Sequence, residues 1–452
     1  MKEIWGRDKN ITYLLKKQKL DQDHPYKWSQ FVLPFESDGK NYLYNTLTRQ
    51  CVETASGLPR GEVFSFARME NDPELITLAE EYFLVPEQKD EVSFYLSIYQ
   101  MMRTLMKKKG FTGYMILPTL GCNARCVYCY EKGRNQSSMN SDTIDRTIRF
   151  ILETRRKDSE IHLSWFGGEP LLRADVIDTV CRAMREKGIV YRSSIITNGS
   201  LVSEKTIDQM AGLWKVKKVQ ISMDCAEQEY RKRKNYFQYE NTYRNVIRNA
   251  EMIAQQGIRV AIRCNVDEKN IDQIPVFLSD LSAVIKNKTN ITAYFAPLFD
   301  FQKTPDFPYL WKKILDAKDS VERAGFRSLP DSNLRRLKAN FCMADQPSGS
   351  AVITPDGDLY TCEHCEPGTS YGNIFQGTTR PEILRGFVEA GTVREKCRNC
   401  PLLPECTPFS KCPGERSFCR ETGMESMLYA LRKRVNTNMC GMADSEDSEL
   451  IC

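Results

Sequence analysis

Between residues 110 and 300, short apolar runs typical of β-strands alternate with longer segments of helical periodicity. The apolar runs are "GYMILPTL", "IHLSWFGGEP", "SSIITNG", "KKVQISMD", "RVAIRCNV" and "ITAYFAPL". Helical patterns begin near Ser141 and Ala174 and recur in "SEKTIDQMAGLW", "TYRNVIRNAEMIAQQG" and "IDQIPVFLSDLSAVI". Strands alternating with helices of this length predict repeated βα units, a parallel sheet and a full or partial barrel. The predicted fold class is α/β.

A different pattern precedes this region. Residues 26–55 read as two strands joined by a turn near Ser37 to Lys40, and helical stretches follow at 72–83 and 91–109. This layout predicts a small separate module. A packing extension of the barrel is the alternative, and composition does not distinguish the two.

Composition narrows the class of protein. A chain of 452 residues with 41% hydrophobic residues has room for two or three domains and a large core. The net charge of +5 is spread thinly, so we expect no nucleic-acid partner. The stretch "MKEIWGRDKNITYLLKKQKL" lacks the apolar core of a secretion signal, and no apolar run of eighteen residues is present. We therefore expect a cytoplasmic protein with no membrane partner.

Cysteine is the unusual residue type in this chain. There are 17 cysteines but only three histidines, His24, His162 and His364. In a reducing compartment, clustered thiols are metal ligands or catalytic groups before they are disulfides. The shortage of histidine favours sites made only of thiolates, which suit zinc or iron–sulfur clusters.

The stretch "CNARCVYC" places Cys122, Cys126 and Cys129 in one loop directly after the first apolar run. In barrels of βα units, such a loop lies at the face that carries the active site. Three thiolates leave a metal one ligand short of four, and the next cysteine in the chain is Cys181. A cubane cluster held by only three thiolates keeps one iron free for a substrate or cofactor.

These residues resemble the CxxxCxxC loop of radical S-adenosylmethionine (SAM) enzymes, including the aromatic Tyr128 before the third cysteine. The resemblance implies a partial (β/α)6 TIM-like barrel, a [4Fe-4S] cluster that binds SAM, and hydrogen abstraction by a 5′-deoxyadenosyl radical. It also implies SAM contacts after successive strands. These are Gly167, Gly168, Glu169 and Pro170 for the amine, Asn198, Ser222 and Asp224 for the ribose and carboxylate, and Arg263 and Asn265 for the adenine.

From Cys342 the chain runs "CMADQPSGSAVITPDGDLYTC", and "CRNCPLLPEC" begins at Cys397. This pattern is similar to the SPASM domain of peptide-modifying radical SAM enzymes, which carries two auxiliary [4Fe-4S] clusters. Carried over, the first cluster takes Cys342, Cys362 and Cys412, and the second takes Cys397, Cys400, Cys406 and Cys419. The chain departs from the family pattern between Cys406 and Cys412, where five residues replace three.

Several alternatives stay open in this region. Cys365 could supply a ligand, or the first auxiliary cluster could keep an open iron. Cys440 could replace Cys419 as the last ligand of the second cluster. Two zinc ribbons would also fit the CxxC pairs Cys362/Cys365 and Cys397/Cys400. The predicted domains are a recognition module at 1–105, the barrel at 106–310, and a bridging region with the SPASM domain at 311–452.

The expected function is that of a radical SAM maturase that installs thioether cross-links in a ribosomally made precursor peptide. The N-terminal module resembles the winged-helix-like element that captures a leader peptide as an added β-strand. Glu363, or His364 beside it, is the candidate base for substrate deprotonation. A reductant such as flavodoxin or ferredoxin is the expected second partner. The alternatives are a formylglycine-forming sulfatase maturase, a carbon–carbon cross-linking enzyme, and a non-catalytic zinc-binding protein.

Overall fold

The computed structural model of the protein describes most of the chain and groups it into two compact units. The described residues are 1–55, 61–106, 109–129, 131–133, 135–237, 242–298, 307–330, 334–338, 349–388, 393, 395–405 and 419–436. One unit, here called the N-terminal unit, comprises Met1–Lys107, Pro330–Asp345 and Phe387–Cys452. The other, the barrel unit, comprises Lys108–Leu329 and Gln346–Gly386.

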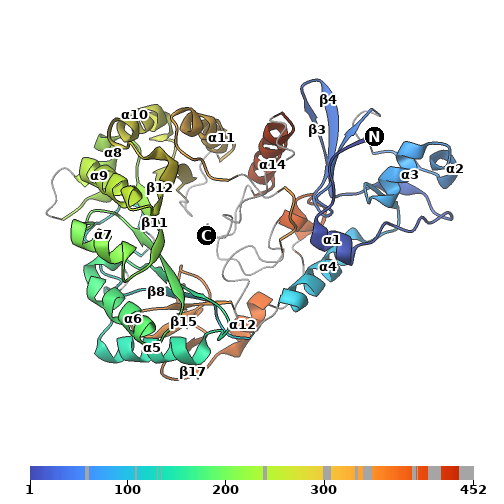
Figure 1. Cartoon of the computed structure of the whole chain (residues 1–452). Coiled ribbons are helices and arrows are strands. Elements are labelled where there is room, and N and C mark those ends of the chain that lie inside the picture. Colours follow the sequence, from blue (N-terminus) through green and yellow to red (C-terminus); the bar gives the residue numbers. More distant parts are fainter. Residues whose placement is uncertain are drawn as a thin grey trace. The chain divides into compact units, whose positions relative to one another are not determined.

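The barrel unit is built on parallel strands that lie side by side in chain order, as Figure 1 shows. This confirms the predicted α/β class with a partial barrel. The strands are β8 (Gly113–Ile116), β9 (Ile161–Trp165), β10 (Tyr191–Thr197), β11 (Val216–Met223), β12 (Arg259–Val266) and β13 (Ile291–Pro297).

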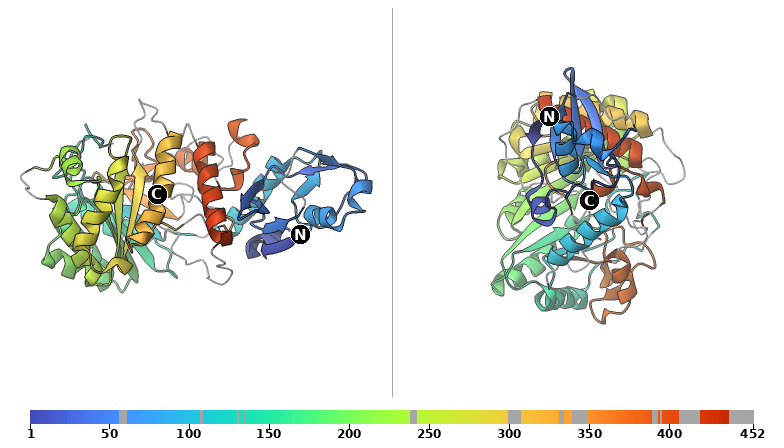
Figure 2. Two further views of the ribbon diagram at one scale, coloured as in Figure 1. Left: turned by 90° about the horizontal axis from the view of Figure 1, so that it is seen from above. Right: turned by 90° about the vertical axis from the view of Figure 1, so that its right-hand side faces the viewer.

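Amphipathic helices cover the outer face of this sheet (Figures 1 and 2). In α6 (Ala174–Glu186), for example, Val176, Val180 and Met184 are buried in the main core, and each buried side chain of this size stabilises the fold by about 1.5–3 kcal/mol. The other helices of the unit are α5 (Ser141–Thr154), α7 (Glu204–Ala211), α9 (Thr242–Gln255), α10 (Ile274–Val284), α11 (Phe307–Arg323) and the short α8 (Glu227–Lys234), which has no apolar stripe. Short 3₁₀ turns are η1 (Pro170–Arg173), η2 (Ile271–Gln273) and η3 (Lys288–Asn290).

A later segment continues the barrel sheet beyond β8. Strand β14 (Ser350–Ile353) pairs parallel with β8, and three antiparallel strands follow. These are β15 (Asp358–Tyr360), β16 (Gly372–Asn373) and β17 (Gly377–Thr378), with α12 (Pro381–Val388) after them. Part of the region predicted as a separate C-terminal domain therefore belongs to the barrel unit by its contacts.

The N-terminal unit contains the predicted hairpin. Asp38 and Gly39 both have positive φ, of 49° and 71°, which suits the tight turn between paired residues Ser37 and Lys40. One antiparallel sheet has the order β1 (Lys2–Trp5), β5 (Cys51–Thr54), β4 (Lys40–Asn45), β3 (Val32–Ser37). A second sheet has the order β6 (Val63–Phe64), β2 (Tyr26–Trp28), β7 (Leu84–Pro86). The helices are α1 (Lys9–Leu14), α2 (Phe66–Met69), α3 (Pro73–Glu80) and α4 (Glu91–Met106).

The hydrophobic cores of this unit include residues from the C-terminal part of the chain. Leu402 and Leu431 pack in one cluster with Leu33, Phe35 and the strands around them. Leu431 belongs to α14 (Cys419–Asn436), whereas Leu403 of η5 (Leu403–Glu405) and Cys397 of α13 (Glu395–Arg398) pack in a second cluster. The predicted recognition module thus shares its core with the segments that carry the last cysteines.

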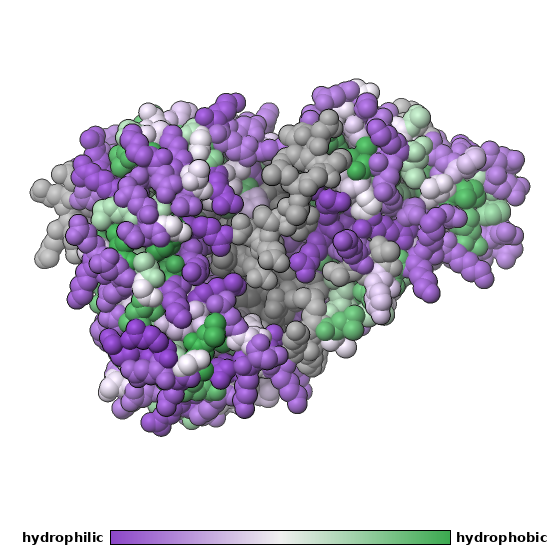
Figure 3. Space-filling model, viewed as in Figure 1, coloured by the Kyte–Doolittle hydropathy of each residue, from purple (hydrophilic) through white to green (hydrophobic). Residues whose placement is uncertain are grey.

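The face drawn in Figure 3 is mainly hydrophilic, with small, separate hydrophobic areas. Among the described residues, no helix is both long enough and apolar enough to cross a bilayer.

Candidate functional site

The cysteine loop follows β8 and is held in place by backbone hydrogen bonds from the end of α8. The N–H groups of Arg125 and Val127 donate to the carbonyls of Lys234 and Arg233, at 3.1 and 3.0 Å. Phe237 N–H donates in return to the Asn123 carbonyl at 3.0 Å. Because these bonds engage the residues between the cysteines, the backbone that carries Cys122, Cys126 and Cys129 is fixed by the fold.

The three thiols are half-buried and close enough to influence one another. The pKa of Cys122 is raised to about 11, mainly by burial and also by the neighbouring Glu169, Cys126 and Cys129, against the hydrogen bond from Ala124. Burial likewise raises the pKa of Cys126. Three thiols gathered in a partly desolvated loop make a donor set that fits an iron–sulfur cluster, whose positive metal ions would displace the protons.

The Gly-Gly-Glu segment after β9 packs directly against this loop. A Cβ at Gly167 would lie 2.3 Å from the Thr119 carbonyl oxygen, and one at Gly168 would lie 2.3 Å from that of Gly121. The N–H groups of Gly168 and Glu169 donate to the same two carbonyls, at 3.1 and 2.9 Å. Both positions therefore require glycine for contact with the chain's own backbone, a reason that the sequence analysis missed. A contact with the SAM amine stays a prediction.

The Glu169 carboxylate is fully buried and connects the segment after β9 to the end of β10. Its Oε1 accepts from the Thr197 hydroxyl at 2.7 Å, and its Oε2 accepts from the Asn198 N–H at 2.8 Å. Burial raises the pKa of Glu169, and these hydrogen bonds oppose the shift. Pro170, also buried, begins η1 directly after it. Glu169 thus ties the GGEP segment to the end of β10.

Asn198 links the end of β10 to the cysteine loop. Its side-chain Nδ2 donates to Asn123 Oδ1 at 2.8 Å and lies 3.9 Å from Cys122 Sγ. Its Oδ1 accepts from the Ser200 N–H and hydroxyl. The structure therefore places this predicted SAM contact beside the cluster loop.

A second polar network joins Tyr128 of the cysteine loop to the ends of β11 and β12. The Tyr128 hydroxyl donates to Asp224 Oδ2 at 2.8 Å and accepts from Asn265 Nδ2 at 3.1 Å. Arg263 Nε donates to Asn265 Oδ1 at 3.2 Å. Asp224 is fully buried, and its Oδ1 has no hydrogen-bond partner among the described residues. A buried acceptor of this kind fits a ligand that brings a donor.

Lys234 completes this network and was missed from the sequence. Its Nζ donates to Ser222 Oγ at 3.0 Å and lies 3.9 Å from Asp224 Oδ2. Burial opposes the charge, but Cys126 and Asp224 nearby outweigh it and leave the pKa of Lys234 raised. From the sequence, the stretch "RKRK" would be expected on the solvent-exposed surface. No periodicity in α8 distinguishes the exposed Arg231 and Lys232 from the buried residues 233 and 234.

The comparisons with known proteins agree with this geometry. The model of the radical SAM superfamily matches residues 116–281, which include the cysteine loop and the GGEP segment. A probable GTP 3′,8-cyclase of Methanococcus maripaludis is 32% identical over 273 residues, which cover 58% of this chain and 82% of that protein. The chain belongs to the radical SAM superfamily.

Other relatives extend the likeness. An uncharacterised protein of Methanocaldococcus jannaschii is 25% identical over 273 residues, covering 59% of this chain and 89% of its own. Among solved structures, native anSMEcpe with bound AdoMet has a TM-score of 0.55 at 18% identity and covers 72% of this chain and 98% of its own. Streptococcus suis SuiB bound to precursor peptide SuiA has a TM-score of 0.52 at 16% identity, and the match covers 85% of this chain and 95% of the SuiB chain. At these identities the two structures show the fold.

Membership of the superfamily makes the protein a radical SAM enzyme with SAM and a [4Fe-4S] cluster as cofactors. It excludes the non-catalytic zinc-binding protein that the cysteine pattern alone left open. The roles of the individual site residues remain proposals.

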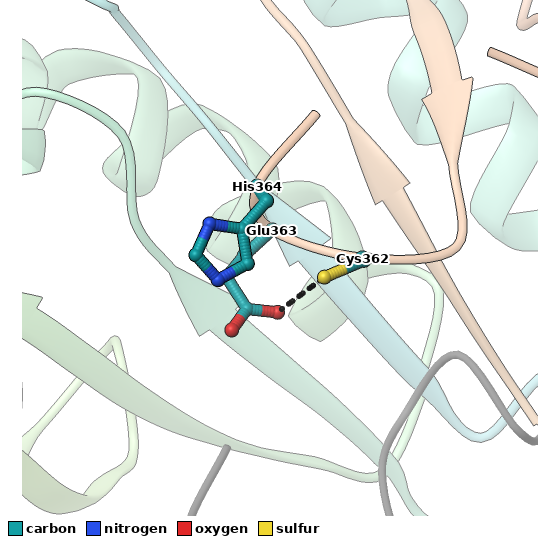
Figure 4. A group of neighbouring side chains, drawn as sticks. All are labelled: Cys362, Glu363 and His364. Atoms are coloured by element: carbon teal, nitrogen blue, oxygen red, sulfur yellow. Dashed lines mark hydrogen bonds between the residues drawn. The ribbon is translucent and has the colours of Figure 1, made fainter. Parts of the chain in front are cut away.

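The C-terminal cysteines are distributed over both units. Cys362 follows β15 of the barrel unit, and its thiol donates to Glu363 Oε2 at 3.4 Å. Figure 4 shows Cys362, Glu363 and His364 turned toward one another, with possible ligand atoms within 4.8 Å. Cys365 is buried, has a φ of 44°, and donates its N–H to the Cys362 carbonyl at 3.1 Å. Both thiols of the CEHC turn therefore lie on one short loop.

Cys397 and Cys400 belong to the N-terminal unit. The Cys400 N–H donates to the Cys397 carbonyl at 3.1 Å, so the two residues share a tight turn. Loop residues between β4 and β5 support it, because Thr46 Oγ1 donates to the Pro401 carbonyl at 2.6 Å and the buried Arg49 forms an ion pair with Glu405.

The remaining predicted ligands cannot be placed around these turns. Cys342, Cys406 and Cys412 lie outside the described residues, as does Cys440, and Cys419 is the first residue of α14. The two auxiliary ligand sets therefore stay predictions.

Proposed function

We propose that this radical SAM enzyme is a peptide maturase that joins a Cys sulfur to a carbon of an acceptor residue in a ribosomally made precursor peptide. The observation that carries the proposal is the combination, in one chain, of the barrel site with an antiparallel N-terminal module and a cysteine-rich C-terminal part. The likeness in fold to SuiB, a protein whose structure contains a precursor peptide, covers 85% of this chain and supports the same conclusion.

The proposal assigns the cofactors to the site described above. Cys122, Cys126 and Cys129 hold the cluster, and the Gly167–Pro170 segment meets the SAM amine. Asn198, Ser222 and Asp224 serve the ribose and carboxylate, while Arg263 and Asn265 serve the adenine. Tyr128 fixes the orientation of Asp224 and Asn265 through its hydroxyl.

Asp224 Oδ1 has no hydrogen-bond partner among the described residues, and this supports the assignment, because a hydroxyl or amino donor of SAM would satisfy it. When bound, the cluster and SAM together supply a 5′-deoxyadenosyl radical that removes a hydrogen atom from the substrate. The protein's part is to hold the reacting groups in place and to exclude water.

Two auxiliary [4Fe-4S] clusters complete the proposal. Cys342, Cys362 and Cys412 would ligate the first, and Cys397, Cys400, Cys406 and Cys419 the second. The buried Cys365, which shares a turn with Cys362, is the alternative ligand for the first.

In the proposed reaction the acceptor carbon loses a hydrogen atom, the Cys thiol loses a proton, and a C–S bond forms. One further electron must leave the product, and an auxiliary cluster would be the acceptor, so the peptide loses two hydrogens in all. Glu363 would be the base that takes the thiol proton of the substrate. If Glu363→Gln still formed product at the wild-type rate, this role would be refuted.

The N-terminal unit is the proposed site for the leader of the precursor. The outer strands of its larger sheet are β1 and β3, and an added strand would pair at one of these edges. Deleting residues 1–100 would be a poor test, because Leu33 and Phe35 share a core with Leu402 and Leu431. The leader is better removed from the precursor, and undiminished modification of the leaderless peptide would contradict leader capture.

The deciding experiment is anaerobic incubation of the full chain with SAM, a reductant such as flavodoxin, and a candidate Cys-containing precursor. We expect 5′-deoxyadenosine and a peptide lighter by two hydrogens per cross-link, with the cysteine no longer alkylated by iodoacetamide. A peptide lighter by two hydrogens whose cysteine still reacts would indicate carbon–carbon cross-linking instead. Conversion of a Cys or Ser to formylglycine would indicate the activity of sulfatase maturases.

A further inference from the structure

Lys234 is the one buried lysine among the residues that the structure describes, with 2% of its surface exposed. Burying an ammonium group costs several kcal/mol unless negative charge compensates it. Lysine is usually found on the surface for this reason. A buried lysine in this position therefore needs a negatively charged partner.

The compensation by the described residues is incomplete. Among them, Asp224 is the carboxylate that pairs with Lys234, but its Oδ2 lies 3.9 Å from Lys234 Nζ and already accepts a 2.8 Å hydrogen bond from Tyr128. Burial raises the pKa of Asp224, and Lys234 opposes the shift. The pair therefore leaves room for further negative charge beside the ammonium group.

The cysteine loop can supply that charge. Lys234 holds this loop through its own backbone, since its carbonyl accepts from the Arg125 N–H, the residue before Cys126. Its Nζ lies 5.9 Å from the ring centroid of Tyr128, the residue before Cys129. The same residue thus supports the loop by its carbonyl and places a cation next to it by its side chain.

We propose that Lys234 is a positioning residue whose fixed positive charge stabilises the thiolate-ligated cluster of Cys122, Cys126 and Cys129 and sets its reduction potential before SAM binds. Reduction adds one negative charge to the cluster, and a nearby buried cation stabilises the reduced form. The effect is large in this position because a partly desolvated site screens charges poorly. The proposal rests on the radical SAM cluster and is independent of the peptide substrate.

The test is a redox titration of the full chain, reconstituted anaerobically and kept free of SAM, with the reduced cluster followed by electron paramagnetic resonance. The signal of the SAM-binding cluster is identified as the one that disappears in a Cys126→Ala variant, which lacks one of its proposed ligands. At a fixed applied potential we expect Lys234→Met to lower the ratio of reduced to oxidised cluster at least tenfold, which is about 59 mV for a one-electron couple. Lys234→Arg keeps the charge and should stay within about threefold of the wild type.

Lys232→Met is the matched control, because Lys232 lies two residues earlier on the same helix and is exposed. It should leave the titration unchanged. Asp224→Asn provides a test of sign: removing a buried negative charge should raise the ratio of reduced to oxidised cluster, opposite to Lys234→Met.

The outcomes are distinct. An unchanged SAM-free titration in Lys234→Met would overturn the proposal, and a shift that emerges only after SAM is added would show that Lys234 acts on SAM instead. Loss of iron from this cluster in Lys234→Met but not in Lys234→Arg would support a charge effect, whereas loss in both would point to packing and overturn it. A shift of the same sign in Asp224→Asn would also contradict the proposal. Because no peptide enters the measurement, failure of the maturase function would leave these results intact.

Discussion

The Cys122–Cys129 loop and the C-terminal cysteines differ in what positions their thiols. In the first, three cysteines lie within eight residues, and backbone bonds from α8 hold the segment that carries them. In the second, Cys362 lies on the barrel unit while Cys397 and Cys400 lie on the N-terminal unit. The predicted partners of Cys362, namely Cys342 and Cys412, are distant from it in sequence.

The difference has a physical reason. A short loop can be fixed by hydrogen bonds to neighbouring strands and helices before any metal binds, because all its ligands move together. Ligands from distant segments gain little from local structure, and metal binding itself contributes the free energy that gathers them. We therefore expect the barrel site to depend on protein packing and the auxiliary sites to depend more on iron. The following predictions test that contrast, from the largest expected effect to the smallest.

Replacing Cys122, Cys126 and Cys129 together by Ala should abolish SAM cleavage. The three thiolates are the proposed ligands of the SAM-binding cluster, and the loop offers no substitute among its described residues. Iron and 5′-deoxyadenosine are measured after anaerobic reconstitution. Much of the iron should remain on the C-terminal cysteines, and loss of all iron would show that the two regions do not load independently.

Gly168→Ala should damage the barrel site although no ligand is removed. The new Cβ would lie 2.3 Å from the Gly121 carbonyl oxygen, so the cysteine loop must shift. Overpacking of about 1–3 kcal/mol corresponds to a loss of roughly fivefold to 150-fold in the rate of 5′-deoxyadenosine formation.

The control for this change is Gly188→Ala. Gly188 has a φ of 65°, so Ala at this position carries a backbone penalty that Gly168→Ala does not, but the added Cβ would meet no atom within 4 Å. Equal losses in both variants would mean that the clash with the cysteine loop has no consequence.

Arg49→Met should loosen the Cys397–Cys400 turn and spare the barrel. The change leaves Glu405 without its buried partner, at a cost of about 3–5 kcal/mol in the N-terminal unit. We expect iron to fall by the content of one cluster while SAM cleavage continues. Arg68→Met, which breaks an exposed pair with Glu62, is the control and should change neither quantity. Loss of SAM cleavage in Arg49→Met would contradict the expectation that the barrel site does not depend on the Cys397–Cys400 turn.

The smallest expected effect is a pH dependence of the stability of the barrel unit. Burial, together with Arg192 and Lys218, lowers the pKa of His162 in β9 to about 4. Because the unfolded value is about 6.5, the neutral ring contributes stability above that pH, and this contribution is lost as pH falls toward 4.

Hydrogen exchange of the metal-free chain at pH 7 and pH 5 measures this effect. Protection in β9 and β10 should fall by about 2 kcal/mol more than protection in β3 and β4, and His162→Gln should remove the difference. An equal fall in both units would place the responsible group elsewhere.

Much of the barrel could be predicted from the sequence, because its signals are local. Buried strands and amphipathic helices have different periods, so "IHLSW" and the helix from Ala174 stand apart without knowledge of the fold. The carboxyl ends of parallel strands meet at one face, which brings Tyr128, Asn198, Asp224 and Asn265 to one region. The hydrogen bonds of Tyr128 and Asn198 follow from that arrangement.

Tertiary structure alone decided the features that depend on distant packing. The need for glycine at Gly167 and Gly168 arises from the carbonyls of Thr119 and Gly121, more than forty residues earlier. Strand β14 joins β8 across more than two hundred residues, which no local pattern encodes. Lys234 stands in a run of four basic residues in a helix with no apolar stripe, and only its packing against the cysteine loop shows that it is buried. The sequence by itself determined the order of the strands and helices and placed most of the candidate site residues at the strand ends. The burial and charge environment of those residues came from the tertiary structure, because desolvation depends on every segment packed nearby and not on sequence neighbours.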